Sequence, residues 1–215
     1  AVAGNGQAED AAQLRVVAAL QELQDQLLRD ASFAGRLRRL LPGSSKSGAR
    51  GIYLWGGVGR GKTFLMDLFF DSLMIEKKRR IHFHRMLRDV HGRLKSLGDV
   101  EDPLDRVAAA LASEIRVLCF DEFFVSDIGD AMILGGLMQE LFDRGVSLVA
   151  TSNIVPDDLY KDGLQRARFL PAIELVKRHC NVVNVDSGVD TGVKVDGKTS
   201  VDNACKYWGS NPNES

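Results

Sequence analysis

The sequence predicts an α/β fold in which helices cover a parallel β-sheet. After residue 50, short apolar runs typical of strands alternate with longer segments of helical periodicity. A repeating strand and helix order is typical of parallel sheets. Directly after the first apolar run, the glycine-rich stretch GGVGRGKT (56–63) leads into an expected helix. The length of 215 residues and the 45% hydrophobic composition suit one soluble domain with additional segments.

Strands and helices of this core are expected in a regular order. We expect strands over 52–55, 80–84, 115–120 and 146–151, helices over 62–74, 85–96, 103–113 and 128–143, and a last helix and strand that end near Val185. Asp102 followed by Pro103 is typical of an N-cap with a first-turn proline. Gly145 stands where a helix should end before the next strand.

The segments that flank the core differ from it in character. Apolar residues recur at helical spacing from Val17 to Leu28 and predict an amphipathic helix that leads toward Leu41 and packs beside the core. The stretch PGSSKSGAR (42–50) is rich in turn formers and predicts a linker. We therefore divide the chain into an N-terminal helical segment with linker (1–50), a phosphate-binding core (51–188) and a tail of little periodicity (189–215).

Charge and composition exclude several classes of protein. Lys and Arg number 28 against 29 Asp and Glu, so the net charge of −1 gives no general attraction to nucleic acid or anionic membranes. The apolar stretches are shorter than the roughly 20 residues of a membrane span, and the N-terminus lacks the pattern of a signal peptide. We therefore expect a cytoplasmic protein. Cys119, Cys180 and Cys205 are too widely separated for a disulfide framework or a CxxC metal site.

The glycine-rich stretch matches G-x-x-x-x-G-K-[ST], the phosphate-binding loop of P-loop NTPases, between a strand and a helix. Its residues are Gly56, Gly57, Val58, Gly59, Arg60, Gly61, Lys62 and Thr63. Glycines let successive N–H groups converge on an anion, and the helix N-terminus adds partial positive charge. We expect Lys62 to contact the β- and γ-phosphates, Thr63 to bind magnesium, and the Arg60 side chain to be solvated. A glycine-rich turn without a ligand is the alternative.

An acidic pair follows the expected strand in IRVLCFDEFF (115–124). Asp121 would then lie at the carboxyl edge of the sheet beside the loop, where it can hold magnesium through water. Glu122, one residue further, can polarise the attacking water. Alone, this pattern is equally typical of an ordinary solvated strand end; the phosphate loop before it favours the catalytic interpretation.

A polar amide ends the strand in VSLVATSN (146–153). If this strand lies between the loop strand and the acidic strand, Asn153 can position water against the γ-phosphate. The alternative is an asparagine that forms a turn.

Basic and histidine side chains gather near the second expected strand. The run Lys77–Arg80 follows a helix, where cations are favoured and remain solvated; a phosphate or nucleic-acid patch is the alternative. His82 and His84 are expected to alternate on one strand face. No further ligand is spaced to complete a metal site, so a structural or partner-contacting role is favoured.

Arg166 and Arg168 lie between the Asn153 strand and the final helix. An oligomeric ATPase offers an arginine from such a position to the γ-phosphate of its neighbour. In a monomer they would be surface cations.

Four segments together resemble the ZapE/AFG-one-like ATPase family, over about residues 15–188. They are GIYLWGGVGRGKTFLMDLFF, RRIHFHRMLRDVH, VLCFDEFFVSDIGDAMILGGLM and LVATSNIVPDDLYKDGLQRARFLPAIELVKRHCNVVNVDSG. The histidine segment, DEFFVSDI and QRARFLP extend well beyond a generic nucleotide-binding pattern.

The resemblance implies a P-loop NTPase of AAA+ type, with three α/β/α layers and a parallel sheet of order 5-1-4-3-2. It implies ATP and Mg²⁺ as cofactors and ATP hydrolysis in a homo-oligomer. For bacterial members it implies FtsZ as the partner, whose polymers are destabilised at the division site. The family carries a helical lid after the core; residues 189–215 do not resemble it, and we interpret them as a truncated or remodelled lid region.

Three functions remain open at this point. They are an oligomeric ATPase that remodels a protein polymer, a DNA-associated initiator or helicase loader, and a nucleotide-switched scaffold. Glu122 argues against the scaffold, because a switch needs no base. The near-neutral charge argues against nucleic acid as a partner.

Overall fold

A five-stranded, wholly parallel sheet forms the centre of the protein. The computed structural model describes residues 3–32 and 48–186. The strands are β1 (Gly51–Trp55), β2 (Lys78–His82), β3 (Val117–Asp121), β4 (Ser147–Ser152) and β5 (Cys180–Asn184). Their order is β2-β3-β4-β1-β5, which is the predicted 5-1-4-3-2 read from the other edge. The α/β prediction and its strand order are therefore confirmed.

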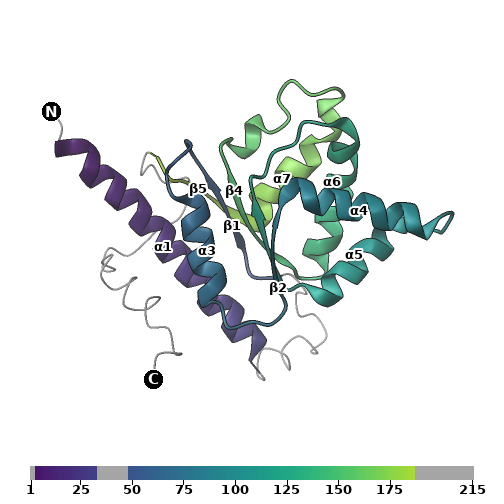
Figure 1. Ribbon diagram of the computed structural model, residues 1–215, viewed down its shortest axis with the longest axis horizontal. Coiled ribbons are helices and arrows are strands. Elements are labelled where there is room, and N and C mark those ends of the chain that lie inside the picture. The colour runs from purple at the N-terminus through teal and green to yellow at the C-terminus, as the bar shows by residue number, and fades with distance from the viewer. Residues whose placement is uncertain (1–2, 33–47, 187–215) are drawn as a thin grey trace.

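Helices cover both faces of the sheet and complete the three layers (Figure 1). On one face lie α1 (Ala3–Ala31) and α3 (Lys62–Ser72). On the other lie α4 (Phe83–Leu97), α5 (Pro103–Glu114), α6 (Ile128–Asp143) and α7 (Leu170–His179). Two short 3₁₀ turns, Pro156–Asp158 and Arg166–Arg168, connect β4 to α7. No helix of the described residues is long and apolar enough to cross a membrane.

Strand β3 is buried on both faces, as expected of a central parallel strand. Because successive side chains of a strand point to opposite faces, Cys119 packs with the α1 and α3 layer, whereas Leu118 and Phe120 pack with the other helices. Asp121 shares the face of Cys119. The alternation therefore directs the acidic side chain toward α3, the helix that follows the phosphate loop.

The N-terminal helix α1 packs its apolar stripe onto the core, as predicted. Leu20 is fully buried, and Leu23 and Leu27 join it in a cluster with residues of α3 and the sheet. The expected continuation to Leu41, residues 42–47 of the linker, Cys205 and the tail over 189–215 lie outside the described residues.

Truncating this stripe is expected to lower stability measurably. Leu20→Ala should reduce the free energy of unfolding by about 2 kcal/mol, the low end for a buried leucine, because α1 can shift over α3 and fill part of the cavity. Leu28→Ala, at a position that is 37% exposed, is the matched control and should change it by less than about 0.5 kcal/mol. Urea unfolding measures both; equal losses would contradict this account of α1 packing.

The predicted histidine strand was placed two residues too late. Strand β2 pairs with β3 from Lys78 opposite Val117 to His82 opposite Asp121, and α4 begins at Phe83. The strand ends there because Phe83 turns into the core, where its ring packs 4.5 Å from that of Phe123. His84 is therefore helical, and the prediction that it alternates with His82 on one strand was wrong; the two rings stack at 5.9 Å instead.

The predicted boundary signals had different outcomes. Helix α5 begins at Pro103 as expected, but Asp102 has φ 47° and its side chain makes no capping hydrogen bond. An N-cap side chain needs an extended backbone to reach back to the helix, so this part of the prediction was wrong. Gly145, with φ 79°, ends the turn after α6 as predicted, and its N–H donates to the carbonyl of Phe142 at 2.8 Å.

Candidate nucleotide site

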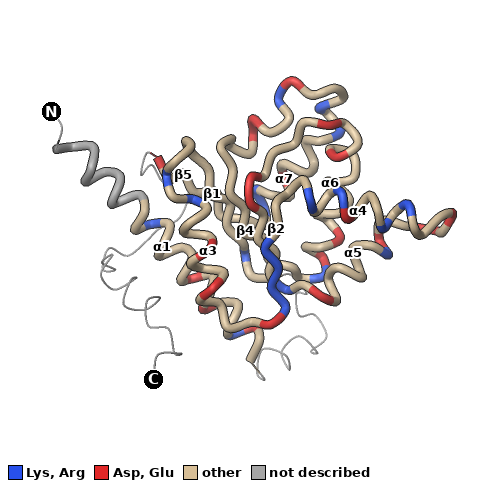
Figure 2. Tube along the Cα trace, in the orientation of Figure 1, with Lys and Arg blue, Asp and Glu red and all other residues tan. Residues whose placement is uncertain are grey.

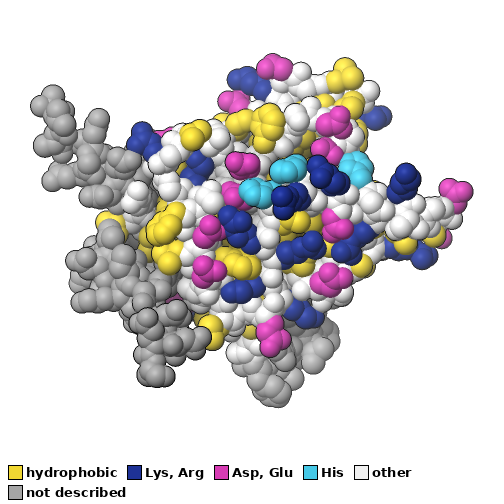
Figure 3. Space-filling model, viewed as in Figure 1, with side chains coloured by type: hydrophobic (Ala, Val, Ile, Leu, Met, Phe, Trp, Pro, Cys, Tyr) yellow, Lys and Arg dark blue, Asp and Glu magenta, His cyan; other side chains and the backbone are white. Residues whose placement is uncertain are grey.

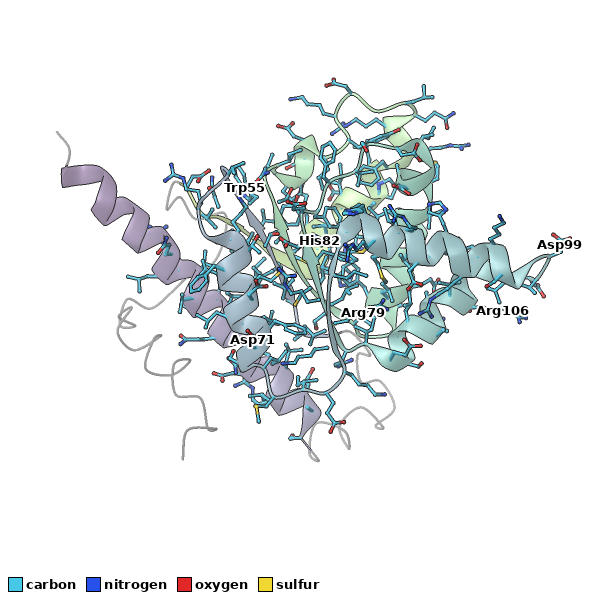
Figure 4. All side chains as sticks on the ribbon, viewed as in Figure 1. Trp55, Asp71, Arg79, His82, Asp99 and Arg106 are labelled. Atoms are coloured by element: carbon cyan, nitrogen blue, oxygen red, sulfur yellow. The ribbon has the colours of Figure 1, made fainter. Side chains whose placement is uncertain are left out.

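A hollow of about 380 Å³ lies at the carboxyl edge of the sheet, where ligands of open α/β sheets bind. In Figure 4, Trp55 and His82 mark the carboxyl ends of β1 and β2 at this edge. The hollow is lined by Val58, Gly59, Arg60, Gly61, Lys62, Thr63, Phe64, Glu122, Thr151, Ser152 and Asn153. Residues from the predicted phosphate loop, the acidic strand and the asparagine strand therefore meet in one place.

The loop has the geometry that its glycines predict. Gly59 and Gly61 have φ of 80° and 78°, which a side chain would strain, although a Cβ at either position would meet no neighbouring atom within 4 Å. Their role is therefore conformational. Lys62 begins α3, is 8% exposed, and its Nζ donates to the carbonyls of Gly56 and Gly57 at 2.7 and 2.6 Å. The backbone carbonyls of the loop therefore hold the side chain of Lys62 in place.

Asp186, which follows β5, braces the loop from the opposite side. Its Oδ2 accepts the N–H of Gly57 at 2.6 Å, and its Oδ1 lies 3.2 Å from Nε of Arg60. The Arg60 side chain is 44% exposed, as predicted, but it is also paired with Asp186, which the sequence did not indicate. Burial lowers the pKa of Lys62 from its ordinary value, and the Asp186 carboxylate acts in the opposite direction.

Asp121 is buried at the end of β3 and is surrounded by donors. Its Oδ1 accepts the hydroxyl hydrogens of Thr63 at 3.0 Å and Thr151 at 2.9 Å. Its Oδ2 accepts Nη2 of Arg80 at 3.1 Å. Because Thr63 donates its hydrogen to Asp121, the lone pairs of its hydroxyl oxygen remain free for a cation. Thr63 and Asp121 therefore form a donor set that fits the predicted magnesium.

Glu122 leaves the line of β3 through an unusual backbone conformation. Its φ is 56°, in the left-handed region that residues other than glycine seldom adopt. The N–H of Glu122 donates to Oγ1 of Thr151 at 3.2 Å, and the next N–H, of Phe123, donates to the Thr151 carbonyl at 2.7 Å. These contacts hold the turn that brings the exposed Glu122 to the wall of the hollow. Backbone strain of this kind is concentrated at functional sites.

Asn153 follows β4 and is exposed at the wall of the hollow. The sheet order places β4 between β1 and β3, which is the condition that its predicted role required. Directly before it, Ser152 donates to the carbonyl of Phe123 at 2.8 Å and ties β4 to the Glu122 turn. Its part in positioning water remains a prediction.

Arg166 and Arg168 are placed apart from the hollow. Both lie in the 3₁₀ turn before α7, and neither lines the site beside its own loop. Nη2 of Arg166 donates to the carbonyl of Asp157 at 2.5 Å, whereas Arg168 is exposed. Their action on a neighbouring subunit remains a prediction.

The basic run Lys77–Arg80 forms a continuous positive stretch along β2 (Figure 2). Nζ of Lys78 donates to the carbonyls of Phe70 and Leu73 at 2.5 and 2.9 Å, which confirms the expected cation at a helix C-terminus. Arg80 departs from the prediction of a solvated run, because it points from β2 toward Asp121.

Three residues of the site were missed from the sequence: Arg80, Thr151 and Asp186. Thr151 carried a usable signal, since it stands in the polar end of the strand that also supplied Asn153. Arg80 carried none, since its contact requires β2 to pair with β3. Asp186 carried none, since its contact requires β5 to pair with β1.

A parallel sheet of this order, with a phosphate loop after β1 and an acidic pair after β3, defines a P-loop NTPase of AAA+ type. The family model described as AFG1-like ATPase matches residues 2–196. The chain belongs to the AFG1-like ATPase family.

Two curated relatives are similar to the chain. It is 64% identical over 141 residues to the cell division protein ZapE of Escherichia coli strain K12, which covers 66% of this chain and 38% of that protein. It is 45% identical over 152 residues to lactation elevated protein 1 homolog B of Danio rerio, and this match covers 66% of this chain and 30% of that protein. The chain thus spans about a third of the length of these relatives.

Among solved structures, AMPPCP-bound DnaA from Aquifex aeolicus has a TM-score of 0.46 and 17% identity, over 72% of this chain and 46% of that one.

Proposed function

We propose that this protein is a Mg²⁺-dependent ATPase that acts as an oligomer to remodel a protein partner in cell division, with FtsZ polymers as that partner. Membership of an ATPase family and the similarity to a cell division protein support the proposal. The observation that carries it is the convergence of Lys62, the Thr63–Asp121 hydrogen bond and Glu122 on one hollow.

The residues of the hollow can be assigned to binding and to chemistry. We expect N–H groups of the loop and the N-terminus of α3 to contact the phosphates, where Lys62 would add a positive charge. Thr63 and Asp121 would hold Mg²⁺, which in P-loop NTPases neutralises charge on the β- and γ-phosphate oxygens. Glu122 would accept a proton from the attacking water, and Asn153 would orient that water.

The oligomer is proposed to complete the site. Arg166 and Arg168 lie away from their own hollow, which fits an arginine that stabilises transition-state charge on the nucleotide of a neighbouring subunit. A monomer would then bind ATP but hydrolyse it slowly.

Rates of ATP hydrolysis measured against protein concentration test the proposal. We expect the rate per subunit to rise with concentration, because neighbouring subunits complete each site, and to rise further when FtsZ polymers are added. If DNA raises the rate of hydrolysis and FtsZ polymers do not, the proposed partner is wrong and nucleic acid is the partner instead. A rate per subunit that is independent of concentration and of both partners would contradict the oligomeric mechanism.

A further inference from the structure

Arg80 connects the edge strand β2 to the predicted magnesium site. Its guanidinium forms a two-point ion pair with Asp67 of α3, and its Nη2 also donates to Oδ2 of Asp121. The Asp121 side chain is only 6% exposed, against 29% for Arg80 and 41% for Asp67. Arg80 therefore places a positive charge directly against a buried carboxylate.

Two carboxylates therefore share one guanidinium beside the predicted cation position. Thr63 and Asp67 are four residues apart on α3, so they lie on the same face of that helix. Arg80 reaches the same region from β2, where basic and histidine side chains gather on the surface (Figure 3). A divalent cation held by Thr63 and Asp121 would share the Asp121 carboxylate with Arg80.

Charge, and not position, is what Arg80 contributes to Asp121. The orientation of Asp121 is fixed independently through Oδ1, which accepts both Thr63 and Thr151. Loss of Arg80 therefore leaves the carboxylate in place and removes a positive charge from its Oδ2. Loss of Asp67 has the opposite effect: it removes a negative charge and leaves Arg80 free to bind Asp121 more strongly.

We propose that the Arg80–Asp67 pair sets the Mg²⁺ affinity of the nucleotide site. Arg80 weakens metal binding by repelling the cation and occupying Oδ2 of Asp121. Asp67 strengthens metal binding by drawing Arg80 away. The proposal rests on the magnesium nucleotide site proposed above. A merely structural ion pair would behave differently, because loss of either partner would then change the Mg²⁺ affinity in the same direction.

The test is equilibrium binding of a fluorescent, non-hydrolysable ATP analogue, mant-AMPPNP, in a Mg²⁺ series and in EDTA. The measured quantity is the ratio of the dissociation constant in EDTA to that in Mg²⁺. Arg80→Gln should raise this ratio about fivefold, and Asp67→Asn should lower it by a similar factor. Arg80→Lys, which keeps the charge but not the two-point contact with Asp67, should shift the ratio less than Arg80→Gln does. Mn²⁺ binding followed by electron paramagnetic resonance gives a second readout.

Arg79→Gln is the matched control, because Arg79 pairs with Asp89, 3.6 Å away, on the other face of β2. It should leave the ratio unchanged. If Arg80→Gln does not fold, the nearly isosteric Asp67→Asn must still lower the ratio. Shifts in the same direction, or no shift in either variant, overturn the inference alone. A wild-type protein that binds the analogue equally in Mg²⁺ and EDTA overturns the magnesium site and the inference with it.

Discussion

Glu122→Gln is expected to leave ATP bound but almost unhydrolysed, whereas Lys62→Ala should abolish nucleotide binding. Lys62 lies within the loop and begins α3, so its removal takes away the charge that is proposed to contact phosphate in the ground state. Glu122 stands at the wall of the hollow, and its proposed contact is with water. The loss of a general base typically lowers turnover by about 10²- to 10⁴-fold.

A titration with mant-ATP beside a phosphate-release assay separates the two effects. Glu122→Gln keeps the size and the left-handed backbone of the turn, so its thermal unfolding should match the wild type. Asp127→Asn is a useful control: Asp127 caps α6 in the same loop, accepting the N–H of Gly129 at 2.7 Å, and is not assigned to the chemistry. Hydrolysis by Glu122→Gln at the wild-type rate would mean that the base is assigned to the wrong residue.

Alanine at Arg166 or Arg168 is expected to lower turnover by about 10³-fold or more while ATP affinity stays nearly unchanged. The reason is that an arginine supplied to a neighbouring site stabilises charge that develops only in the transition state. Arg168 is exposed, and Arg166 donates to the carbonyl of Asp157, so the two substitutions also compare an exposed cation with an anchored one. Lys161→Ala, a 65% exposed cation on the same connection, is the control.

Mixing the arginine variant with Lys62→Ala tests whether the site is shared between subunits. Some interfaces of the mixed oligomer would combine an intact loop from one subunit with an intact arginine from the next. Partial recovery of hydrolysis is therefore expected, and such recovery cannot arise within one chain. If both variants still assemble as the wild type does and the mixture stays inactive, the assignment in trans is wrong.

The local parts of the site could be predicted from the sequence. The phosphate loop, the acidic pair and the asparagine each stand at the end of a short apolar strand, where a single stretch of sequence determines both the strand and the residue that follows. Parallel pairing then brings these ends together without further information. The helix over 128–143 was predicted at its observed bounds. Gly145 marked the turn after its end, and in the structure Asp127 caps its start.

The contacts that connect distant strands could not be predicted. In the sequence, Arg80 is one of four consecutive cations in KKRR and is expected to be solvated. Only the pairing of β2 with β3 places it two positions from Asp121 on the same face of the sheet. In the sequence, Asp186 only follows a strand. The pairing of β5 with β1 is what brings its carboxylate to the N–H of Gly57 in the loop. Both depend on register between strands far apart in the sequence, which the local pattern does not contain.

Single-turnover hydrolysis of γ-labelled ATP most directly tests the central claim, that this hollow is a site of ATP hydrolysis. The protein is held in excess over ATP, at concentrations that allow assembly, in Mg²⁺ and in EDTA, with Lys62→Ala as the matched control. The account predicts labelled phosphate at a rate that rises with protein concentration in Mg²⁺, and none above background in EDTA or with Lys62→Ala. Bound ATP that stays intact in Mg²⁺ at every concentration would contradict it and would make the protein a nucleotide-switched scaffold.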